Sequence, residues 1–236
     1  MKTFRAGPLL VRSVGGTDRD GGGDGPAVLL CHGYGAPGDD LVSLYRAVRA
    51  PEGTRWFFPE APGDLGAGSD GRAWWQIDMM KLQLAMMRGE HRALADEVPA
   101  GLDEARDALE QCIDALGEHH GVVRDRLVIG GFSQGAMVAT ELGLYGAHRY
   151  AGLAVLSGTL LCQSRWAEKQ GRLRDLPIVQ SHGKADPILA FSGAEALRDF
   201  FTVAGAKLSW IPFAGQHAIP ASALTGLEQL LTTTLA

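Results

Sequence analysis

A serine between two glycines is the residue in this chain that is best placed for covalent chemistry. The segment Gly131-Phe-Ser-Gln-Gly135 follows the apolar run 126–130 and leads into the apolar stretch 136–144. This order predicts a strand, a tight turn and a helix, with Ser133 at the turn. The glycines leave room for a strained backbone, and the start of the helix directs amide groups toward the serine, where they would stabilise an anion. The pattern favours a serine nucleophile over the alternative, a glycine-rich turn in which Ser133 only caps the helix.

A serine hydroxyl is a poor nucleophile near neutral pH, so it needs a histidine to accept its proton and a carboxylate to orient that histidine. In enzymes of the α/β-hydrolase type these residues follow one another in the order serine, acid, histidine. Three aspartates and three histidines come after Ser133 in the chain: Asp175, Asp186, Asp199, His148, His182 and His217. The partners of the serine are therefore sought among them.

Asp186 and His217 are the pair that the sequence favours. Asp186 lies just beyond the predicted strand 176–181, and His217 follows the predicted strand 207–213. Side chains at the carboxyl ends of parallel strands gather at one edge of the sheet, where active sites form. Asp186 also precedes a proline, which favours a turn that could hold the carboxylate. The alternatives are a simple turn aspartate and a loop histidine.

The other four residues fit catalysis less well. His182 also ends a strand, but no acid before it is well placed, so we expect its hydrogen bonds to shape the Asp186 loop. Asp199 falls on the solvated face of a predicted helix, and Asp175 precedes its strand, at the opposite edge of the sheet. His148 lies near a helix end and is expected at the surface.

The reaction also needs backbone N–H donors for the oxyanion of the tetrahedral intermediate. One donor should be the amide of Gln134, directly after the nucleophile, and the other should come from the glycine-rich loop after an interior strand. We assign the amide of Tyr34, with Gly33 or Gly35 as alternatives, and expect His32 to support the loop. Phosphate binding is disfavoured because the loop lacks the pattern of a nucleotide-binding motif.

Apolar runs alternate with helical patterns along the chain, which is the signature of a mostly parallel sheet with helices on both faces. We therefore predict an α/β-hydrolase fold and a single domain over residues 1–236. Residues 15–25, rich in glycine and aspartate, are expected to form a flexible connection. The predicted strands are 8–14, 27–31, 54–58, 126–130, 150–156, 176–181 and 207–213, and the predicted helices are 39–49, 98–120, 136–144, 192–204 and 223–235.

Composition disfavours several classes of function. Of the 236 residues 46% are hydrophobic and 21% charged, and the net charge is −5 without a basic cluster, so nucleic acid is not an expected partner. No apolar run reaches the ~20 residues of a membrane helix, which argues against stable membrane insertion. The N-terminus lacks a signal-peptide pattern, which predicts a cytoplasmic location. Cys31, Cys112 and Cys162 have no metal-ligand or disulfide spacing, and we expect the first two to be buried.

Four motifs together resemble the phospholipase/carboxylesterase family of α/β-hydrolases, the group that contains acyl-protein thioesterases and small bacterial carboxylesterases. The resemblance spans about residues 26 to 220 and implies a triad of Ser133, Asp186 and His217, in agreement with the order of the residues. It also implies hydrolysis of carboxylic esters or thioesters without a cofactor. The motifs are His32-Gly-Tyr-Gly35, Gly131-Phe-Ser-Gln-Gly135, His182-Gly-Lys-Ala-Asp186 and Gly215-Gln-His-Ala-Ile219.

An apolar insert at about 72–98 contains four of the six methionines of the chain. Methionine side chains adapt to irregular shapes, so the insert could cap or wall an acyl-binding cleft, with Trp74, Trp75, Met79 and Met86 as substrate-binding residues. Two alternatives are a helix packed on the core and a contact between two copies of the chain in a homodimer.

Together these observations predict a serine carboxylesterase that hydrolyses small-molecule esters of short to medium acyl chains through an acyl-enzyme intermediate. A lysophospholipase or an acyl-protein thioesterase would use the same triad and is the alternative within enzymes. A non-catalytic ligand-binding protein on the same scaffold is the alternative from another class, because fold does not fix function.

Overall fold

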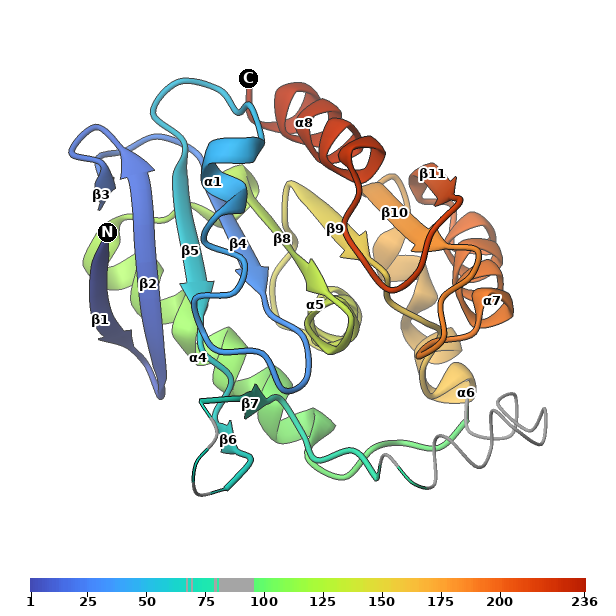
Figure 1. The fold of residues 1–236 in the computed structure, drawn as a ribbon. Coiled ribbons are helices and arrows are strands. Elements are labelled where there is room, and N and C mark those ends of the chain that lie inside the picture. The colour runs from blue at the N-terminus through green and yellow to red at the C-terminus, as the bar shows by residue number, and fades with distance from the viewer. Residues whose placement is uncertain (67, 69, 79, 81–95) are drawn as a thin grey trace.

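One large sheet dominates the structure (Figure 1). The computed structural model describes residues 1–66, 68, 70–78, 80 and 96–236. Within these residues nine strands form a sheet in the order β1-β2-β5-β4-β8-β9-β10-β11, with β3 paired to β2. The strands are β1 (Lys2–Ala6), β2 (Leu9–Gly16), β3 (Asp20–Gly22), β4 (Ala27–Cys31), β5 (Arg55–Pro59), β8 (Leu127–Phe132), β9 (Gly152–Leu156), β10 (Pro177–Gly183) and β11 (Lys207–Phe213).

Strand direction brings the candidate residues to one edge. Neighbouring strands from β5 to β11 run parallel, and only β2 pairs antiparallel, with β1 and with β5. The carboxyl ends of β4, β8, β10 and β11 therefore point the same way, toward the loops that contain the candidate residues. The prediction of a mostly parallel sheet is confirmed. A separate two-stranded sheet is formed by β6 (Gly63–Asp64) and β7 (Arg72–Ala73).

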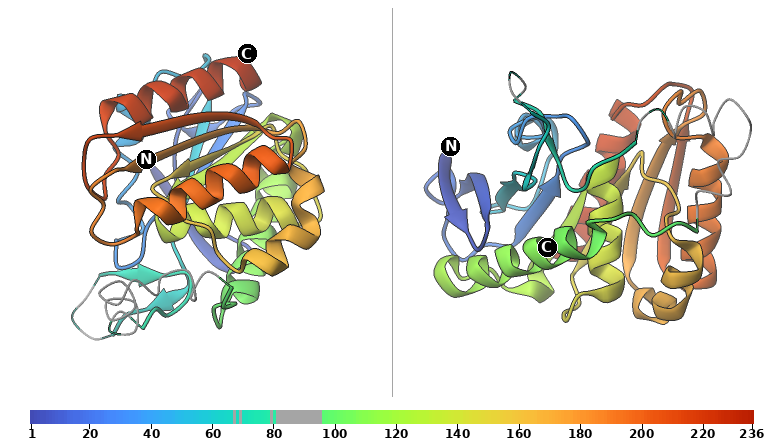
Figure 2. Two further views of the ribbon diagram at one scale, coloured as in Figure 1. Left: turned by 90° about the vertical axis from the view of Figure 1, so that its right-hand side faces the viewer. Right: turned by 90° about the horizontal axis from the view of Figure 1, so that it is seen from below.

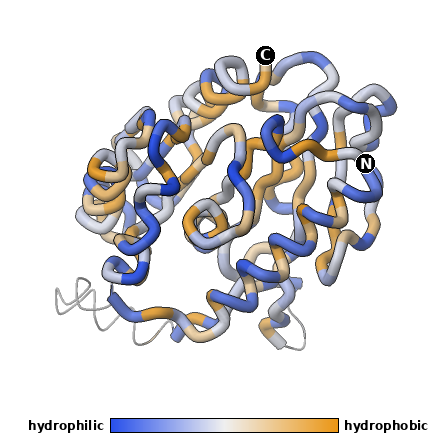
Figure 3. Tube along the Cα trace, turned by 180° about the vertical axis from the view of Figure 1, so that it is seen from behind, coloured by the Kyte–Doolittle hydropathy of each residue, from blue (hydrophilic) through white to orange (hydrophobic). Residues whose placement is uncertain are grey.

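Helices cover both faces of the sheet (Figure 2). The interior strand β4 is buried on both sides. Leu29 belongs to the core cluster that contains residues of α4, α5, α6 and α7, whereas Leu30 belongs to the cluster that contains residues of α8 and of the segment around α1. This two-sided burial explains why the central strands are continuous apolar runs, which form the hydrophobic centre of Figure 3. The helices are α1 (Leu44–Ala47), α4 (Leu102–His120), α5 (Gln134–Tyr145), α6 (Gln163–Lys169), α7 (Phe191–Val203) and α8 (Ala221–Leu235).

The predicted helix 39–49 is wrong in extent, since only residues 44–47 are helical. The preceding residues form successive tight turns, in which the amides of Val42 and Leu44 donate to carbonyls three residues earlier. The apolar residues whose spacing suggested a helix are buried without one: Leu41 and Val48 both belong to the core cluster that contains residues of α8.

The predicted flexible connection 15–25 is also wrong, because β2 extends to Gly16 and residues 20–22 form β3. Gly15 and Gly16 have positive φ angles of 78° and 69°, which glycine adopts without steric cost. The Asp18 carboxylate accepts hydrogen bonds from the amides of Asp20 and Gly22, and these bonds lower its pKa and hold the turn. Gly15 and Gly16 thus allow the bulge in the pairing of β2 with β3.

All three cysteines are free and buried, as expected for Cys31 and Cys112. Burial raises the pKa of Cys112 and of Cys162 to about 12 and that of Cys31 well above its ordinary value of 9.0. Their thiols are therefore neutral small hydrophobic groups near neutral pH. In the part of the chain that the structure describes, helices that combine the length and the hydropathy needed to cross a membrane are absent.

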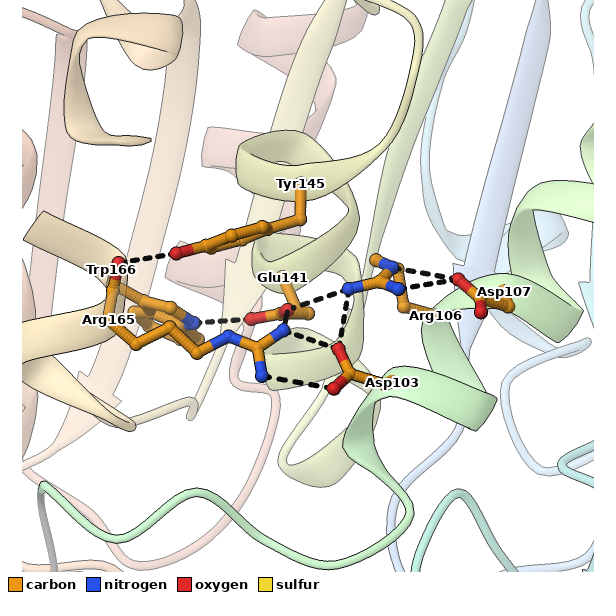
Figure 4. A network of polar contacts seen from close by, with 7 residues as sticks. All are labelled: Asp103, Arg106, Asp107, Glu141, Tyr145, Arg165 and Trp166. Atoms are coloured by element: carbon orange, nitrogen blue, oxygen red, sulfur yellow. Dashed lines mark hydrogen bonds and ion pairs between the residues drawn. The ribbon is translucent and has the colours of Figure 1, made fainter. Parts of the chain in front are cut away.

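A buried carboxylate joins the helices α4, α5 and α6 (Figure 4). Glu141 of α5 accepts hydrogen bonds from the Trp166 indole nitrogen (2.6 Å) and from the Arg165 guanidinium (2.6 Å), both on α6. Arg106 of α4 also reaches this carboxylate, at 3.4 Å, and both arginines contact Asp103. Burial raises the pKa of Glu141 above its ordinary value, although the indole and the two guanidinium groups act in the opposite direction.

Replacing Glu141 with alanine leaves the indole N–H and the guanidinium groups without their buried acceptor. We expect Glu141→Ala to lower the free energy of unfolding by about 3–5 kcal/mol, measured by urea denaturation. Glu141→Gln keeps an oxygen for the indole, and burial already disfavours the charged form, so its cost should be about 1–2 kcal/mol. The control is Asp107→Ala, which removes an exposed partner of Arg106 and should cost less than about 1 kcal/mol. Equal losses in the two Glu141 variants would contradict this account.

Candidate active site

Ser133 occupies a strained turn between β8 and α5. Its φ and ψ angles are 54° and −118°, which residues with a side chain rarely adopt, and the residue is 9% exposed. A Cβ atom at Gly135 would come well within 3.0 Å of the Cys31 carbonyl oxygen, and one at Gly131 would meet the same oxygen. The two glycines are thus required by the close approach of β8 and α5 to β4. The predicted strand–turn–helix around Ser133 is confirmed.

Asp186 and His217 meet at this same edge of the sheet. The His217 Nδ1 and the Asp186 Oδ2 are 2.6 Å apart, and the other carboxylate oxygen accepts the amides of Ile188 (2.8 Å) and Leu189 (2.9 Å). Burial alone would raise the pKa of Asp186, but hydrogen bonds from His182, His217 and the two amides outweigh it and hold this pKa well below its ordinary value of 3.8. A carboxylate that stays ionised keeps the proton of the imidazole on Nδ1 and leaves Nε2 free to accept another.

His182 supports the Asp186 loop, as the sequence predicts. Its Nε2 lies 3.0 Å from the Leu189 carbonyl oxygen and 3.3 Å from the Asp186 Oδ2. Both neighbours are acceptors, so Nε2 carries a proton and donates. His182 is thus a second histidine that contacts the Asp186 carboxylate. Its side chain is fully buried, whereas that of His217 is 11% exposed.

Ser133 and His217 come together through their neighbours. The rings of Phe132 and His217 pack with centroids 4.7 Å apart, and the Ser133 amide donates to the Leu156 carbonyl at the end of β9 (2.9 Å). Among the described residues the Ser133 hydroxyl forms no hydrogen bond. Catalytic hydrogen bonds of ligand-free enzymes are often long and tighten when substrate binds. Proton transfer between the two residues would need this closer approach.

Three backbone amides of the segments that contain the oxyanion-hole candidates have no acceptor in the described part of the chain. In the glycine-rich loop the Gly35 amide donates to the Arg72 carbonyl (2.9 Å), which removes Gly35 from the three candidates. The amides of Gly33, Tyr34 and Gln134 have no acceptor among the described residues. Gln134 begins α5, so its N–H has no intrahelical partner and lies at the positive end of the helix dipole.

The loop that contains Tyr34 is held by His32 and by β7. His32 Nδ1 donates to the Gly33 carbonyl (2.8 Å), and its Nε2 accepts the Ala61 amide (3.1 Å). Burial lowers the pKa of His32, which favours this neutral form. The Arg72 amide donates in turn to the Ala36 carbonyl (3.0 Å). His32 therefore has the supporting role that the sequence predicts.

Of the four residues predicted to bind substrate, two lie in the core and two lie outside the described residues. Trp74 and Trp75 are 3% and 6% exposed and belong to the core that contains α4 and α5. The Gln134 side chain binds their backbone, accepting the Trp74 amide (2.9 Å) and donating to the Trp75 carbonyl (2.8 Å). This placement favours the packing alternative for the two tryptophans. Met79 and Met86 lie outside the described residues.

Sequence reasoning missed two features of this site. Nothing in the local pattern indicated that the Gln134 side chain would bind the backbone of a segment 59 residues away, at Trp75. Ser157, directly after β9, contacts the His217 loop through its hydroxyl and adopts a φ of +52°. The serine directly after a predicted strand end was the single available signal for the second feature.

Solved structures define the class of this fold. The structure of esterase PE8 superposes with a TM-score of 0.78 at 22% identity, over 96% of this chain and 99% of that one. A Bacillus cereus carboxylesterase superposes with a TM-score of 0.71 at 16% identity, over 96% of this chain and 94% of that one. Together with the mostly parallel sheet, they show an α/β-hydrolase fold.

Sequence comparison narrows the class to a family. The family model described as Phospholipase/Carboxylesterase matches residues 22–235, so the chain belongs to this family of hydrolases. Acyl-protein thioesterase 1 of Neurospora crassa is 27% identical over 220 residues, 88% of this chain and 86% of that protein. Acyl-protein thioesterase 1 of Schizosaccharomyces pombe is 31% identical over 166 residues, 69% of each chain. A probable carboxylesterase of Oryza sativa subsp. japonica is 28% identical over 208 residues, 85% of this chain and 74% of that protein.

The contact at Gly135 can be tested against a second glycine of the same helix. Gly135→Ala would press a methyl group against the Cys31 and His32 carbonyls, so we expect the free energy of unfolding to fall by at least about 2–3 kcal/mol. At Gly143 the nearest atom to an added Cβ is 3.6 Å away, an ordinary contact. Gly143→Ala should therefore be neutral or stabilise by up to about 1 kcal/mol through helix propensity. Thermal unfolding of both variants checks this, and similar stabilities would refute the contact.

Proposed function

We propose that this protein is a serine carboxylesterase in which Ser133, Asp186 and His217 form the catalytic triad. The observation that carries the proposal is the hydrogen bond between His217 and the ionised Asp186, at the sheet edge where Ser133 is held in a strained turn. In this assignment Asp186 orients the imidazole, His217 is the general base and acid, and Ser133 is the nucleophile.

The proposed reaction has two half-reactions. Ser133 Oγ attacks the ester carbonyl carbon while His217 Nε2 takes the hydroxyl proton, and the amides of Tyr34 and Gln134 donate to the oxyanion. The intermediate collapses when the bond to the leaving alcohol breaks and His217 returns the proton to that oxygen. Water then repeats the sequence on the acyl-serine, which releases the carboxylic acid and restores Ser133.

The proposed substrates are small-molecule carboxylic esters with short to medium acyl chains. Apolar side chains flank the triad, since Phe132 packs on His217 and Ile188, two residues after Asp186, is 41% exposed. These groups suit an acyl chain beside the reacting carbonyl. Acyl-protein thioesterase activity on the same triad is the second candidate, favoured by the names of the fungal relatives. Lysophospholipase activity on that triad is the other alternative within enzymes.

A fluorophosphonate probe tests the triad, because it reacts covalently with an activated serine. We expect labelling of the wild type and none of Ser133→Ala. Asp186→Asn should retain the fold but reduce kcat by about 10³–10⁴, since the histidine then adopts the wrong tautomer. Asp199→Asn, on the exposed face of α7, is the matched control and should keep wild-type activity. Folded wild type that neither labels nor hydrolyses any ester would favour a ligand-binding protein instead.

A hydrolysis screen separates the candidate substrates. We expect p-nitrophenyl esters from acetyl to decanoyl to be hydrolysed with higher kcat/KM than the palmitoyl ester, because the proposed substrates have short to medium chains. Turnover of lysophosphatidylcholine or of a palmitoylated peptide thioester should be lower still, and Ser133→Ala is the blank in every assay. A preference for palmitoyl thioester over short esters would assign the thioesterase alternative.

A further inference from the structure

The loop that contains His217 is attached at few points. Before the histidine, the Ala185 amide donates to the Gly215 carbonyl (2.9 Å), and the His217 ring itself binds Asp186. After the histidine, the Ser157 hydroxyl donates to the Ala218 carbonyl (3.1 Å). Among the described residues, this is the one hydrogen bond of the backbone groups of 216–219. After His217 the loop is therefore held by the Ser157 hydroxyl, at the Ala218 carbonyl, and by Ile219, which packs against the core cluster that contains residues of α8.

Ser157 occupies a conformation that a serine rarely takes. It is fully buried and has a φ of +52°, in the left-handed region that a glycine enters without steric cost. Its amide donates to the carbonyl of Ser181 in β10 (2.8 Å). A side chain in such a backbone costs free energy that the surroundings must offset. The feature that distinguishes serine from glycine here is the hydroxyl bound to Ala218.

Ser157 also connects the base to the nucleophile. The residue before it, Leu156, accepts the Ser133 amide through its carbonyl (2.9 Å). Leu156 thus binds the turn that holds Ser133, and Ser157, the next residue, binds the residue after His217. These two neighbouring hydrogen bonds join Ser133 and His217 by a route that is independent of Asp186.

We propose that Ser157 is a positioning residue that sets the distance between the His217 imidazole and the Ser133 hydroxyl. The inference rests on the proposed triad, because Ser157 would act only through His217. Ser157 itself is given no contact with substrate. Loss of its hydroxyl leaves the ends of the loop and the Asp186 bond in place but removes the hydrogen bond to the peptide between Ala218 and Ile219. Misplacement of a catalytic group by a fraction of an ångström slows the chemical step while substrate binding is kept.

Two substitutions at position 157 separate positioning from stability. Ser157→Ala removes the hydroxyl and keeps the strained backbone, whereas Ser157→Gly removes both. We expect both variants to lose about tenfold or more in kcat with KM within twofold of wild type, and to react with the fluorophosphonate more slowly by a similar factor. Ser157→Gly should have a higher melting temperature than Ser157→Ala, because glycine adopts the positive φ without strain.

The control is Ser181→Ala, on the adjacent strand β10. The Ser181 hydroxyl is also fully buried but has no hydrogen-bond partner among the described residues, so its loss should leave kcat unchanged. Wild-type kcat and labelling rates in both Ser157 variants would overturn the inference, as would activity that rises with stability from Ser157→Ala to Ser157→Gly. Absence of labelling and hydrolysis in the wild type would instead overturn the proposed function.

Discussion

The packing of α5 against the end of β4 is the constraint on which the rest of the site depends. At Gly135 the helix lies so close to the Cys31 carbonyl that there is no room for a side chain, and at Gly131 the strand meets the same carbonyl. This packing forces the turn between the two glycines, and with it the positive φ of Ser133. It also aims the first amides of the helix at the space in front of the serine. A substitution that separated α5 from β4 would disturb the nucleophile and its anion donor together.

The sequence predicted those parts of the site that depend on neighbours in the chain. A strand, a turn and a helix around Ser133 follow from residues 126–144, and the parallel sheet then places residues after β10 and β11 at the same edge. Asp186 and His217 could be chosen because so few acids and histidines follow the serine. The local pattern gave the wrong extent of helix at residues 39–49, where tertiary packing determines the structure. The apolar residues there are spaced as in a helix because Leu41 and Val48 are buried in the core cluster that contains residues of α8.

The features that the sequence could not predict are contacts between distant segments. Ser157 meets Ala218, 61 residues later, and Gln134 meets the backbone of Trp74, 60 residues earlier. Neither contact leaves a periodic or spaced pattern, because each involves one side chain and one peptide group. Both are nevertheless specific to the site, since one binds the loop of the candidate base and the other belongs to the residue that follows the candidate nucleophile. Strained backbone at both serines, Ser133 and Ser157, marks the same edge.

The burial of all three cysteines has a practical consequence for following this protein in solution. Each thiol is shielded and its pKa is raised, so the reactive thiolate is scarce in the folded chain. A water-soluble maleimide would consequently modify the chain only during excursions that open the core. Alkylation of Cys31 would report separation of β4 from α5, and alkylation of Cys112 would report detachment of α4. The order in which the two thiols react would therefore show which part of the structure opens first.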